Sequence, residues 1–319
     1  MKRVHRNEIH LDAPFFSPMS FQKFGLISLI SIYMLILAGA IVRSTGSGMG
    51  CPDWPKCFGR YIPPTQASEL PFNYQEIYKA KLHGEVVFNP TKTWIEYINR
   101  LLGALTGLFV FITALLSFKE QKQVRNYSLA ALLFILGNAV LGKYVVDSFL
   151  LPGVVTAHML LSIGVLFFLI KALNIQSSYV VKPLSARNWV GINLLVIFIQ
   201  ILVGTQVREN MDHVILDLGE GAKNQWVSHL DVTFIIHRTF SWLVFISHLI
   251  LWNKMKESSH QLYRHGVMVL IGISFLTGIL MAYFALPLGS QAIHLVIALI
   301  LVGWHIQTWI ETKNLKWQA

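Results

Sequence analysis

The stretch Ile236-His237-Arg238 reads like an earlier one, Glu96-Tyr97-Ile98-Asn99-Arg100, and each lies near the start of a long apolar run. A histidine in another apolar run follows each of them after nearly the same interval. His158 lies 59 residues after Asn99 (158 − 99 = 59), and His294 lies 57 residues after His237 (294 − 237 = 57). The chain therefore looks like two copies of one four-helix unit. One copy pairs two histidines, and the other pairs a histidine with an asparagine.

The composition predicts an all-α membrane protein. Hydrophobic residues make up 54% of the 319 residues, charged residues make up only 13%, and the mean hydropathy is +0.53. Soluble proteins carry about 25% charged residues. A helix that crosses a bilayer needs about 20 apolar residues. We expect eight such helices, at about 24–43, 94–117, 127–147, 153–173, 189–208, 232–253, 265–283 and 288–309.

The distribution of charge predicts the orientation in the membrane. The formal net charge is +10, and the positive-inside rule explains this excess better than nucleic-acid binding does. With the N-terminus inside, fourteen lysines and arginines fall in inner segments and seven in outer ones. We therefore expect both termini to be cytoplasmic and the acidic segment 209–231 to lie outside. Because the first 23 residues do not form a cleavable signal, we expect a multi-pass protein of a bacterial inner (plasma) membrane.

The repeat also predicts the domain organisation. Gly39-Ala40-Ile41-Val42-Arg43 closes the first span, and Gly204-Thr205-Gln206-Val207-Arg208 closes the fifth. Four-helix bundles commonly hold cofactors between facing helices. We expect a cytoplasmic tail at 1–23, an N-terminal bundle at 24–173, a cytoplasmic linker at 174–188, a C-terminal bundle at 189–309 and a cytoplasmic tail at 310–319. The N-terminal bundle includes a long outer loop at 44–93, with a short helix near 73–82.

Five histidines lie within the predicted spans, at positions 158, 237, 248, 294 and 305. Ionisable residues inside a membrane are costly and indicate function. His237 and His294 begin helices that both run from outside to inside, so they lie at matched depth. Two imidazoles at one depth can bind a haem iron from both sides. The alternative is that each histidine only makes a hydrogen bond to a neighbouring helix.

Four arginines lie at the outer ends of helices, namely Arg43, Arg100, Arg208 and Arg238. Guanidinium groups suit carboxylates, and haem carries two propionates. We therefore predict that these arginines bind propionates; the alternative is that they extend to lipid headgroups.

Glu96 shares a helical face with Asn99 and Arg100. Because it stands at the membrane edge near the expected place of His158, we predict that it carries protons for chemistry beside the iron. The alternative is an ion pair with Arg100.

The only two cysteines, Cys51 and Cys57, lie in the first outer loop. Two close cysteines on the oxidising side of a membrane predict a disulfide, which is either structural or redox-active. They lack the CxxCH pattern, which argues against covalently attached haem.

Taken together and in order, these motifs resemble the haem A synthase family. The resemblance extends from about Gly25 to Trp309. It rests on the Gly-x-x-Val-Arg helix end with Ser44-Thr45-Gly46-Ser47-Gly48-Met49, the loop Gly50-Cys51-Pro52-Asp53-Trp54-Pro55-Lys56-Cys57, Glu96-Tyr97-x-x-Arg100, Ala157-His158-Met159, His237-Arg238 and Ile293-His294-Leu295.

The resemblance implies two four-helix bundles related by a pseudo-twofold axis. It implies a haem b cofactor between His237 and His294 in the C-terminal bundle, and the substrate haem O in the N-terminal bundle. The enzyme would oxidise a porphyrin methyl group of haem O to a formyl group, giving haem A for terminal oxidases. Glu96 matches a family glutamate with a role in that oxidation, and Cys51 and Cys57 match a family disulfide. The implied partners are haem O, a membrane electron donor, haem O synthase and oxidase assembly factors, with no nucleic acid.

The chain departs from the family pattern at Asn99, where the usual residue is histidine. An amide is a poor ligand for haem iron. We therefore predict that His158 alone binds the substrate iron and leaves one position open; the alternative is a variant with altered activity.

The main alternative function is a di-haem b-type cytochrome for quinol-linked electron transfer. His248 follows His237, and His305 follows His294, by 11 residues, which is about three helical turns and about 16 Å. Two stacked haems would fit that spacing. We favour it less because His248 and His305 lie near Trp252, Lys254, Trp309 and Lys313, a belt in which histidines meet headgroups. A transporter and an assembly factor without turnover are further alternatives.

Overall fold

The computed structural model describes residues 20–79, 87–175, 186–256, 261–287 and 289–313. Eight of its helices are long and apolar enough to cross a membrane, which confirms the predicted number. They are α1 (Phe21–Ser44), α3 (Pro90–Leu116), α4 (Lys122–Asp147), α5 (Pro152–Asn174), α6 (Ala186–Leu218), α7 (Val232–Lys254), α8 (Gln261–Tyr283) and α9 (Ser290–Lys313). The tails and the linker that the sequence predicts lie largely outside the described residues.

Several of these helices begin at residues that favour a helix start. The side chains of Ser20, Asn89 and Asp231 accept hydrogen bonds from backbone N–H groups in the first turns of α1, α3 and α7. Such caps satisfy donors that have no partner inside the helix. Proline at the first position of α3 and of α5 lacks the N–H that would go unused there.

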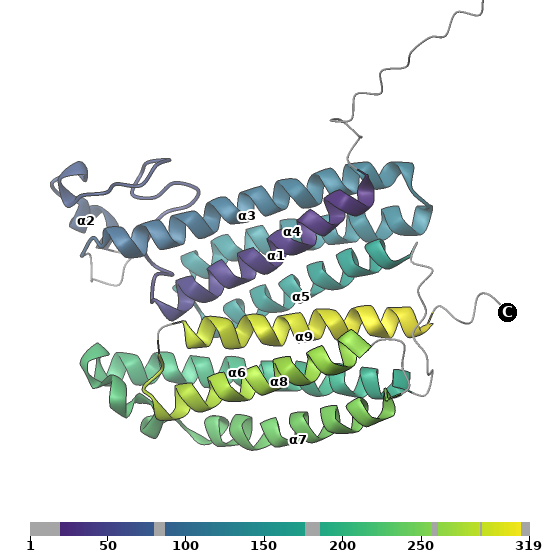
Figure 1. Ribbon diagram of the computed structural model, residues 1–319. Coiled ribbons are helices and arrows are strands. Elements are labelled where there is room, and N and C mark those ends of the chain that lie inside the picture. The colour runs from purple at the N-terminus through teal and green to yellow at the C-terminus, as the bar shows by residue number, and fades with distance from the viewer. Residues whose placement is uncertain (1–19, 80–86, 176–185, 257–260, 288, 314–319) are drawn as a thin grey trace, which may run out of the picture.

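The helices pack in a repeating pattern (Figure 1). In the first half α1 packs on α3, α3 on α4, α4 on α5, and α5 on α1. In the second half α6 packs on α7, α7 on α8, α8 on α9, and α9 on α6. The two halves meet where α9 lies against α1 and α5 and where α5 touches α6. Figure 1 also shows that α1 begins and α9 ends at the same end of the molecule, opposite to α2 (Tyr74–Tyr78).

Close contact between the halves depends on a glycine in α9. A Cβ added at Gly303 would lie 2.0 Å from the hydroxyl oxygen of Tyr33 on α1. Any larger residue would push Tyr33 out of the shared apolar core, to which both helices contribute. The identity of this one residue therefore sets how near α1 and α9 approach.

The outer loops differ in part from the prediction. In the first loop, α2 and the 3-10 turn η1 (Ala67–Glu69) are helical, and α2 lies in the range predicted for a short helix. The second outer segment is not a loop throughout, because α6 continues ten residues past Arg208 to Leu218. No glycine or proline interrupts it until Gly219, whose φ of 76° ends the helix. The 3-10 segment η4 (Glu220–His229) then packs Trp226 against Met211 and Val214.

Candidate functional site

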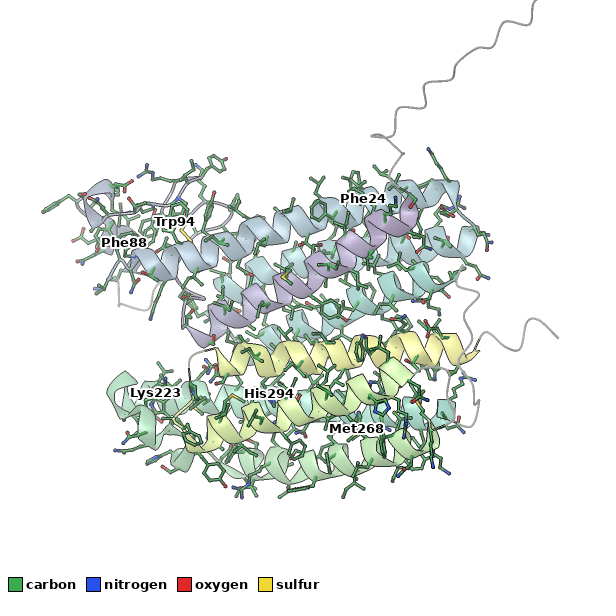
Figure 2. The ribbon with its side chains drawn as sticks, viewed as in Figure 1. Phe24, Phe88, Trp94, Lys223, Met268 and His294 are labelled. Atoms are coloured by element: carbon green, nitrogen blue, oxygen red, sulfur yellow. A yellow bond between two sulfur atoms is a disulfide. The ribbon has the colours of Figure 1, made fainter. Side chains whose placement is uncertain are left out.

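The structure brings His237 and His294 together, as the sequence predicts. His237 lies in the second turn of α7 and His294 in the second turn of α9, and their ring centres are 6.4 Å apart. Two imidazoles that bind one metal ion from opposite sides, through bonds of about 2 Å each, have ring centres about 6 Å apart. The separation of these two rings is therefore that of a pair of axial ligands. His294 is one of the residues labelled in Figure 2, where it lies toward the end that carries the outer loops.

A threonine fixes the proton on His294. The Oγ1 atom of Thr277 on α8 lies 2.9 Å from His294 Nδ1. The same Oγ1 atom also lies within hydrogen-bond distance of the carbonyl oxygens of Ile273 and Ser274. When the single hydroxyl hydrogen is donated to either carbonyl, Thr277 accepts from His294. The His294 Nδ1 atom then carries the hydrogen, and Nε2 keeps the lone pair that a metal needs. No sequence pattern pointed to Thr277.

The ring of His237 has fewer hydrogen-bond partners than that of His294. Gln200 on α6 donates from Nε2 to the His237 carbonyl oxygen at 3.0 Å, and the same nitrogen lies 3.4 Å from His237 Nε2. His237 Nδ1 is buried and has no hydrogen-bond partner. A buried polar atom of this kind indicates a missing ligand or a place where the ring turns when a ligand binds.

A glycine on the neighbouring helix faces each of the four positions of the repeat. A Cβ added at Gly204 would lie 3.1 Å from His237, and one at Gly278 would lie 3.8 Å from His294. In the first half, a Cβ at Gly142 would lie 3.1 Å from His158, and one at Gly39 would lie 3.8 Å from Asn99. Gly142 precedes His158, and Gly278 precedes His294, by the same interval (158 − 142 = 16; 294 − 278 = 16). The repeated helix ends at Gly39 and Gly204 were the sequence signal for two of these contacts.

In the first half, both candidate positions leave a polar atom unsatisfied. His158 Nδ1 and Asn99 Oδ1 are buried and have no hydrogen-bond partner. Ser162 donates to the His158 carbonyl oxygen at 3.1 Å, and Asn138 on α4 donates to Ser162 at 2.9 Å. Neighbouring helices thus hold the backbone of α5 at this level, while the ring nitrogen and the amide oxygen remain available.

These observations fit a haem in the second half. The ring separation and the tautomer that the Thr277 contact favours suit two ligands of one haem iron. Among the described residues, no group of three or more His, Cys, Asp or Glu side chains surrounds either pair.

Two of the four arginines that were predicted to bind propionates form ion pairs with an acidic residue. Arg43 Nη2 lies 2.6 Å from Asp212 Oδ2, and Arg208 Nη2 lies 2.8 Å from Asp212 Oδ1. Arg208 also donates to the Arg43 carbonyl oxygen. Arg238 is exposed, with its guanidinium over the ring of Phe234. The three arginines therefore differ in how free they are to bind a further anion.

Arg100 and Glu96 organise the disulfide loop. Cys51 and Cys57 form the predicted disulfide. Arg100 donates to the carbonyl oxygens of Cys51, Asp53 and Lys56, and its Nη2 lies 2.5 Å from Glu96 Oε1. Glu96, whose side chain is 4% exposed, also accepts from the Cys51 N–H at 2.8 Å. The structure therefore contains the ion pair that the sequence left as the alternative for Glu96.

The interpretation of His248 and His305 as headgroup contacts is wrong. Both are fully buried, and their ring centres lie 5.2 Å apart. The belt of tryptophan and lysine is present at this end of α7 and α9, but these two histidines point between the helices. The cavity beside His248 has a volume of only about 10 Å³, room for about one water molecule.

Comparison with known proteins identifies the family. The model of the COX15-CtaA family, described as cytochrome oxidase assembly protein, matches residues 22–306. The chain belongs to this family.

Curated relatives include proteins named heme A synthase. The one from Flavobacterium psychrophilum is 26% identical over 85% of this chain and 92% of its own length. The one from Shewanella oneidensis is 28% identical over 65% of this chain and 62% of its own length. The one from Alkalihalophilus pseudofirmus is 32% identical over 37% of this chain, and the match covers about a third of that relative's length.

Proposed function

We propose that this protein is a haem A synthase, which oxidises a porphyrin methyl group of haem O to a formyl group and so makes haem A for terminal oxidases. The observation that carries the proposal is the family match over residues 22–306. The names of the relatives and the facing rings of His237 and His294 support it. The protein would be an oxidoreductase of a bacterial inner membrane.

The two halves would be four-helix bundles related by a pseudo-twofold axis. Each contact within the first half has its equivalent in the second, with α1, α3, α4 and α5 corresponding to α6, α7, α8 and α9. The contact of α1 with α9 corresponds to that of α5 with α6, and α5 with α9 corresponds to itself. A twofold relation predicts this pattern. The even number of spans places both termini on one side, which the positive-inside rule assigns to the cytoplasm.

His237 and His294 would hold a haem b in the C-terminal bundle. A haem at this place supplies one-electron transfer through its iron. Thr277 holds the His294 ring in the tautomer that leaves Nε2 free, and Gln200 anchors the backbone of His237. Because Gly204 and Gly278 carry no side chain, each histidine ring can lie against the neighbouring helix. Arg238, which is exposed at the same end of α7, is placed to meet a propionate.

The N-terminal bundle would bind haem O through His158 alone. Asn99 stands at the position equivalent to His237, and its amide oxygen binds iron poorly. One iron position on the Asn99 side would therefore stay open, next to a buried oxygen that can accept a hydrogen bond. The His158 ring and the Asn99 amide lie against Gly142 and Gly39 of the neighbouring helices. Further along α5, past His158, the helix lines an apolar groove.

That groove is suited to the lipophilic tail of haem O. It has a volume of about 460 Å³ and lies between α4, α5, α6 and α9. Its lining begins at Ile163, five residues past His158 on α5 (163 − 158 = 5), a rise of about 7.5 Å. Phe134, Phe167 and Phe168 contribute aromatic surface. Because the groove opens on the side of the bundle, we propose that haem O enters laterally, from lipid or from haem O synthase.

Glu96 and Arg100 would act by shaping the outer wall of the substrate site. Their ion pair ties the start of α3 to the disulfide loop. A carboxylate there can also pass a proton to a group beside the iron if the ion pair opens. The electron donor would be a membrane component, and oxidase assembly factors would receive the product.

The decisive experiment is expression in bacteria that make haem O but lack a haem A synthase. Extracted haems are separated and identified by mass. We expect haem A, and one haem b per purified chain. A chain that retains haem b, folds and yields no formyl product would contradict the proposed activity. The matched control is His158→Ala, which should keep haem b and lose the formyl product.

A further inference from the structure

A second pair of histidines lies between α7 and α9, away from the pair assigned to haem b. His248 and His305 each follow a residue of that pair by 11 positions (248 − 237 = 11; 305 − 294 = 11). Their relative exposures are 1% and 0%. The proposed haem chemistry uses neither residue. Two fully buried imidazoles at a helix contact therefore need their own explanation.

Both rings are held in the tautomer that suits metal binding. His248 Nδ1 lies 2.6 Å from the Val244 carbonyl oxygen, and His305 Nδ1 lies 2.7 Å from the Leu301 carbonyl oxygen. A carbonyl only accepts, so each Nδ1 carries the hydrogen. Each Nε2 then has a free lone pair, and both Nε2 atoms are buried without a hydrogen-bond partner. A backbone carbonyl behind the imidazole is the usual support of a metal-binding histidine.

The spacing of the rings differs from that of the haem pair in an informative way. The ring centres of His248 and His305 lie 5.2 Å apart with an interplanar angle of 71°. Two imidazoles bound to one metal ion at a tetrahedral angle, through bonds of about 2 Å, have ring centres about 5 Å apart, less than the roughly 6 Å for ligands on opposite sides. The His248–His305 separation thus fits two ligands on the same side of a small ion.

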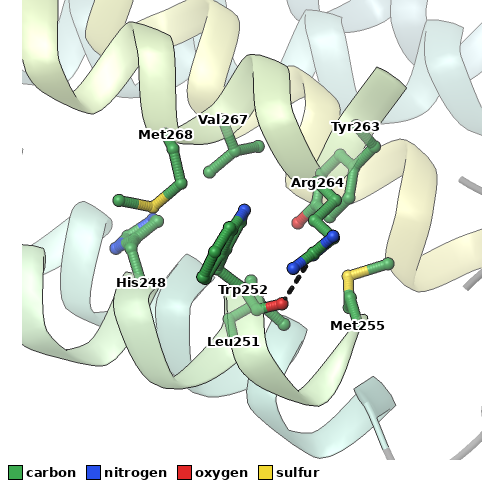
Figure 3. Close-up of a pocket in the computed structure, with 8 residues that line it drawn as sticks. All are labelled: His248, Leu251, Trp252, Met255, Tyr263, Arg264, Val267 and Met268. Atoms are coloured by element: carbon green, nitrogen blue, oxygen red, sulfur yellow. Dashed lines mark hydrogen bonds between the residues drawn. The ribbon is translucent and has the colours of Figure 1, made fainter. Parts of the chain in front are cut away.

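Methionine side chains line the small cavity beside His248 (Figure 3). The small cavity beside His248 is lined by residues of α7 and α8 and by Met255, which follows α7: His248, Leu251, Trp252, Met255, Tyr263, Arg264, Val267 and Met268. Met255 is fully buried, but Figure 3 shows it on the other side of the Trp252 ring from His248. Figure 3 shows the thioether of Met268 next to the ring of His248. The ring of Tyr263 packs 5.7 Å from that of His305.

The donor set selects the metal. The lining residues include no carboxylate and no thiolate, so a divalent ion would bring two charges into an apolar region without compensation. Thioether and imidazole ligands together favour Cu(I). Arg264 also lines the cavity, but its guanidinium lies over the Trp252 ring at 4.2 Å and donates to the Trp252 carbonyl oxygen. The Arg264 guanidinium is therefore held at the edge of the cavity by the backbone and ring of Trp252.

We propose that His248 and His305, with the thioether of Met268, form a binding site for a single Cu(I) ion. The site is separate from the haem sites and does not depend on the proposed synthase activity. It lies toward the end of α7 and α9 opposite to His237 and His294. In Figure 2, Met268 marks this region and His294 marks the other.

The test is anaerobic titration of the purified full-length chain with Cu(I), without a histidine tag, against a coloured Cu(I) chelator. We expect one Cu(I) per chain and an X-ray absorption spectrum with both nitrogen and sulfur neighbours. His248→Gln with His305→Gln should abolish binding. Met268→Leu, which nearly preserves side-chain volume, should weaken binding by about tenfold or more, and Met255→Leu should bind as the unaltered chain does. His265→Gln, an exposed histidine on α8 near the site, is the matched control and should bind as the unaltered chain does.

The helical circular dichroism signal and elution as a single species in detergent report folding in every variant. If the chain takes up no Cu(I), or if the folded double histidine variant binds it as well as the control, the proposal is wrong. A preference for Zn²⁺ over Cu(I), or a single bridging water in an experimental structure of Cu(I)-treated protein, would overturn it as well.

Discussion

Arg43 and Arg208 bind the two oxygens of a single carboxylate, that of Asp212. The two arginines end equivalent helices of the repeat, but Asp212 has no acidic equivalent in the first half, where Ser47 holds the corresponding place (43 + 4 = 47; 208 + 4 = 212). Arg43 of the first half thus forms its ion pair with a carboxylate of the second half. Two guanidinium groups and one carboxylate leave one positive charge at the outer margin, which suits a further anion such as a propionate.

Asp212→Asn should weaken the joint between the halves. The substitution removes the charge that both arginines share, and each pair is partly exposed, so we expect a loss of about 1–2 kcal/mol. Thermal unfolding in detergent should show a Tm lower by a few degrees, with a smaller difference at high salt. Asp217→Asn, an exposed acid on the same helix, is the control. An unchanged Tm in Asp212→Asn would show that the shared carboxylate does not join the halves.

Thr277→Val should reduce haem b binding. Valine has nearly the same shape but cannot accept the hydrogen bond from His294 Nδ1, so the ring is no longer held in the ligating tautomer. Loss of such a support typically costs about 10–100-fold in metal affinity. The haem content of purified protein and the reduction potential of the remaining haem measure the effect. Thr277→Ser keeps the acceptor and should restore both values. Full haem content in the valine variant would mean that Thr277 does not orient the ligand.

The sequence predicts the number of spans but not the local detail of the sites. Apolar runs of bilayer length identify each helix, and the extension of α6 to Leu218 was missed because its acidic residues outweighed the absence of helix breakers. Whether Thr277 meets His294 depends on how each helix is rotated about its own axis. A helix that is apolar on most sides does not reveal that rotation in its sequence. For the same reason, the residues around His248 indicated a membrane belt while the ring itself turned inward.

Gly204→Ala and Gly142→Ala should affect the two proposed haem sites differently. An added Cβ would lie 3.1 Å from the histidine ring in each case, so the ring must move by a few tenths of an ångström. We expect Gly204→Ala to lower haem b content, and Gly142→Ala to spare haem b but lower haem A formation. Gly107→Ala, at a helical glycine with no atom within 4 Å of the added carbon, should be neutral or stabilising by up to about 1 kcal/mol. If all three variants behave alike, the glycines do not make room for ligands.

Glu96→Gln should loosen the disulfide loop. Glu96 and Arg100 have side-chain exposures of 4% and 14%, and removing one partner of a buried ion pair typically costs about 3–5 kcal/mol. The loop should then open more often, so the Cys51–Cys57 disulfide should be reduced and alkylated faster, while haem b content stays the same. Glu76→Gln, an exposed acid on α2, should leave the rate unchanged. Loss of turnover with an unchanged rate of reduction would instead assign Glu96 a purely chemical role.

Asn99→His should change the coordination of the substrate iron. His237 stands at the equivalent position and lies 6.4 Å from its partner ring, so an imidazole in place of Asn99 should reach the iron from the side opposite His158. We expect haem O bound to the variant to become low-spin and six-coordinate, as seen in the Soret band and by electron paramagnetic resonance. Turnover should fall because the open position is filled. Asn99→Leu, which removes the amide without adding a ligand, should keep the spectrum of the unaltered chain. An Asn99→His spectrum identical to that of the leucine variant would place Asn99 away from the iron and remove the argument for an open position.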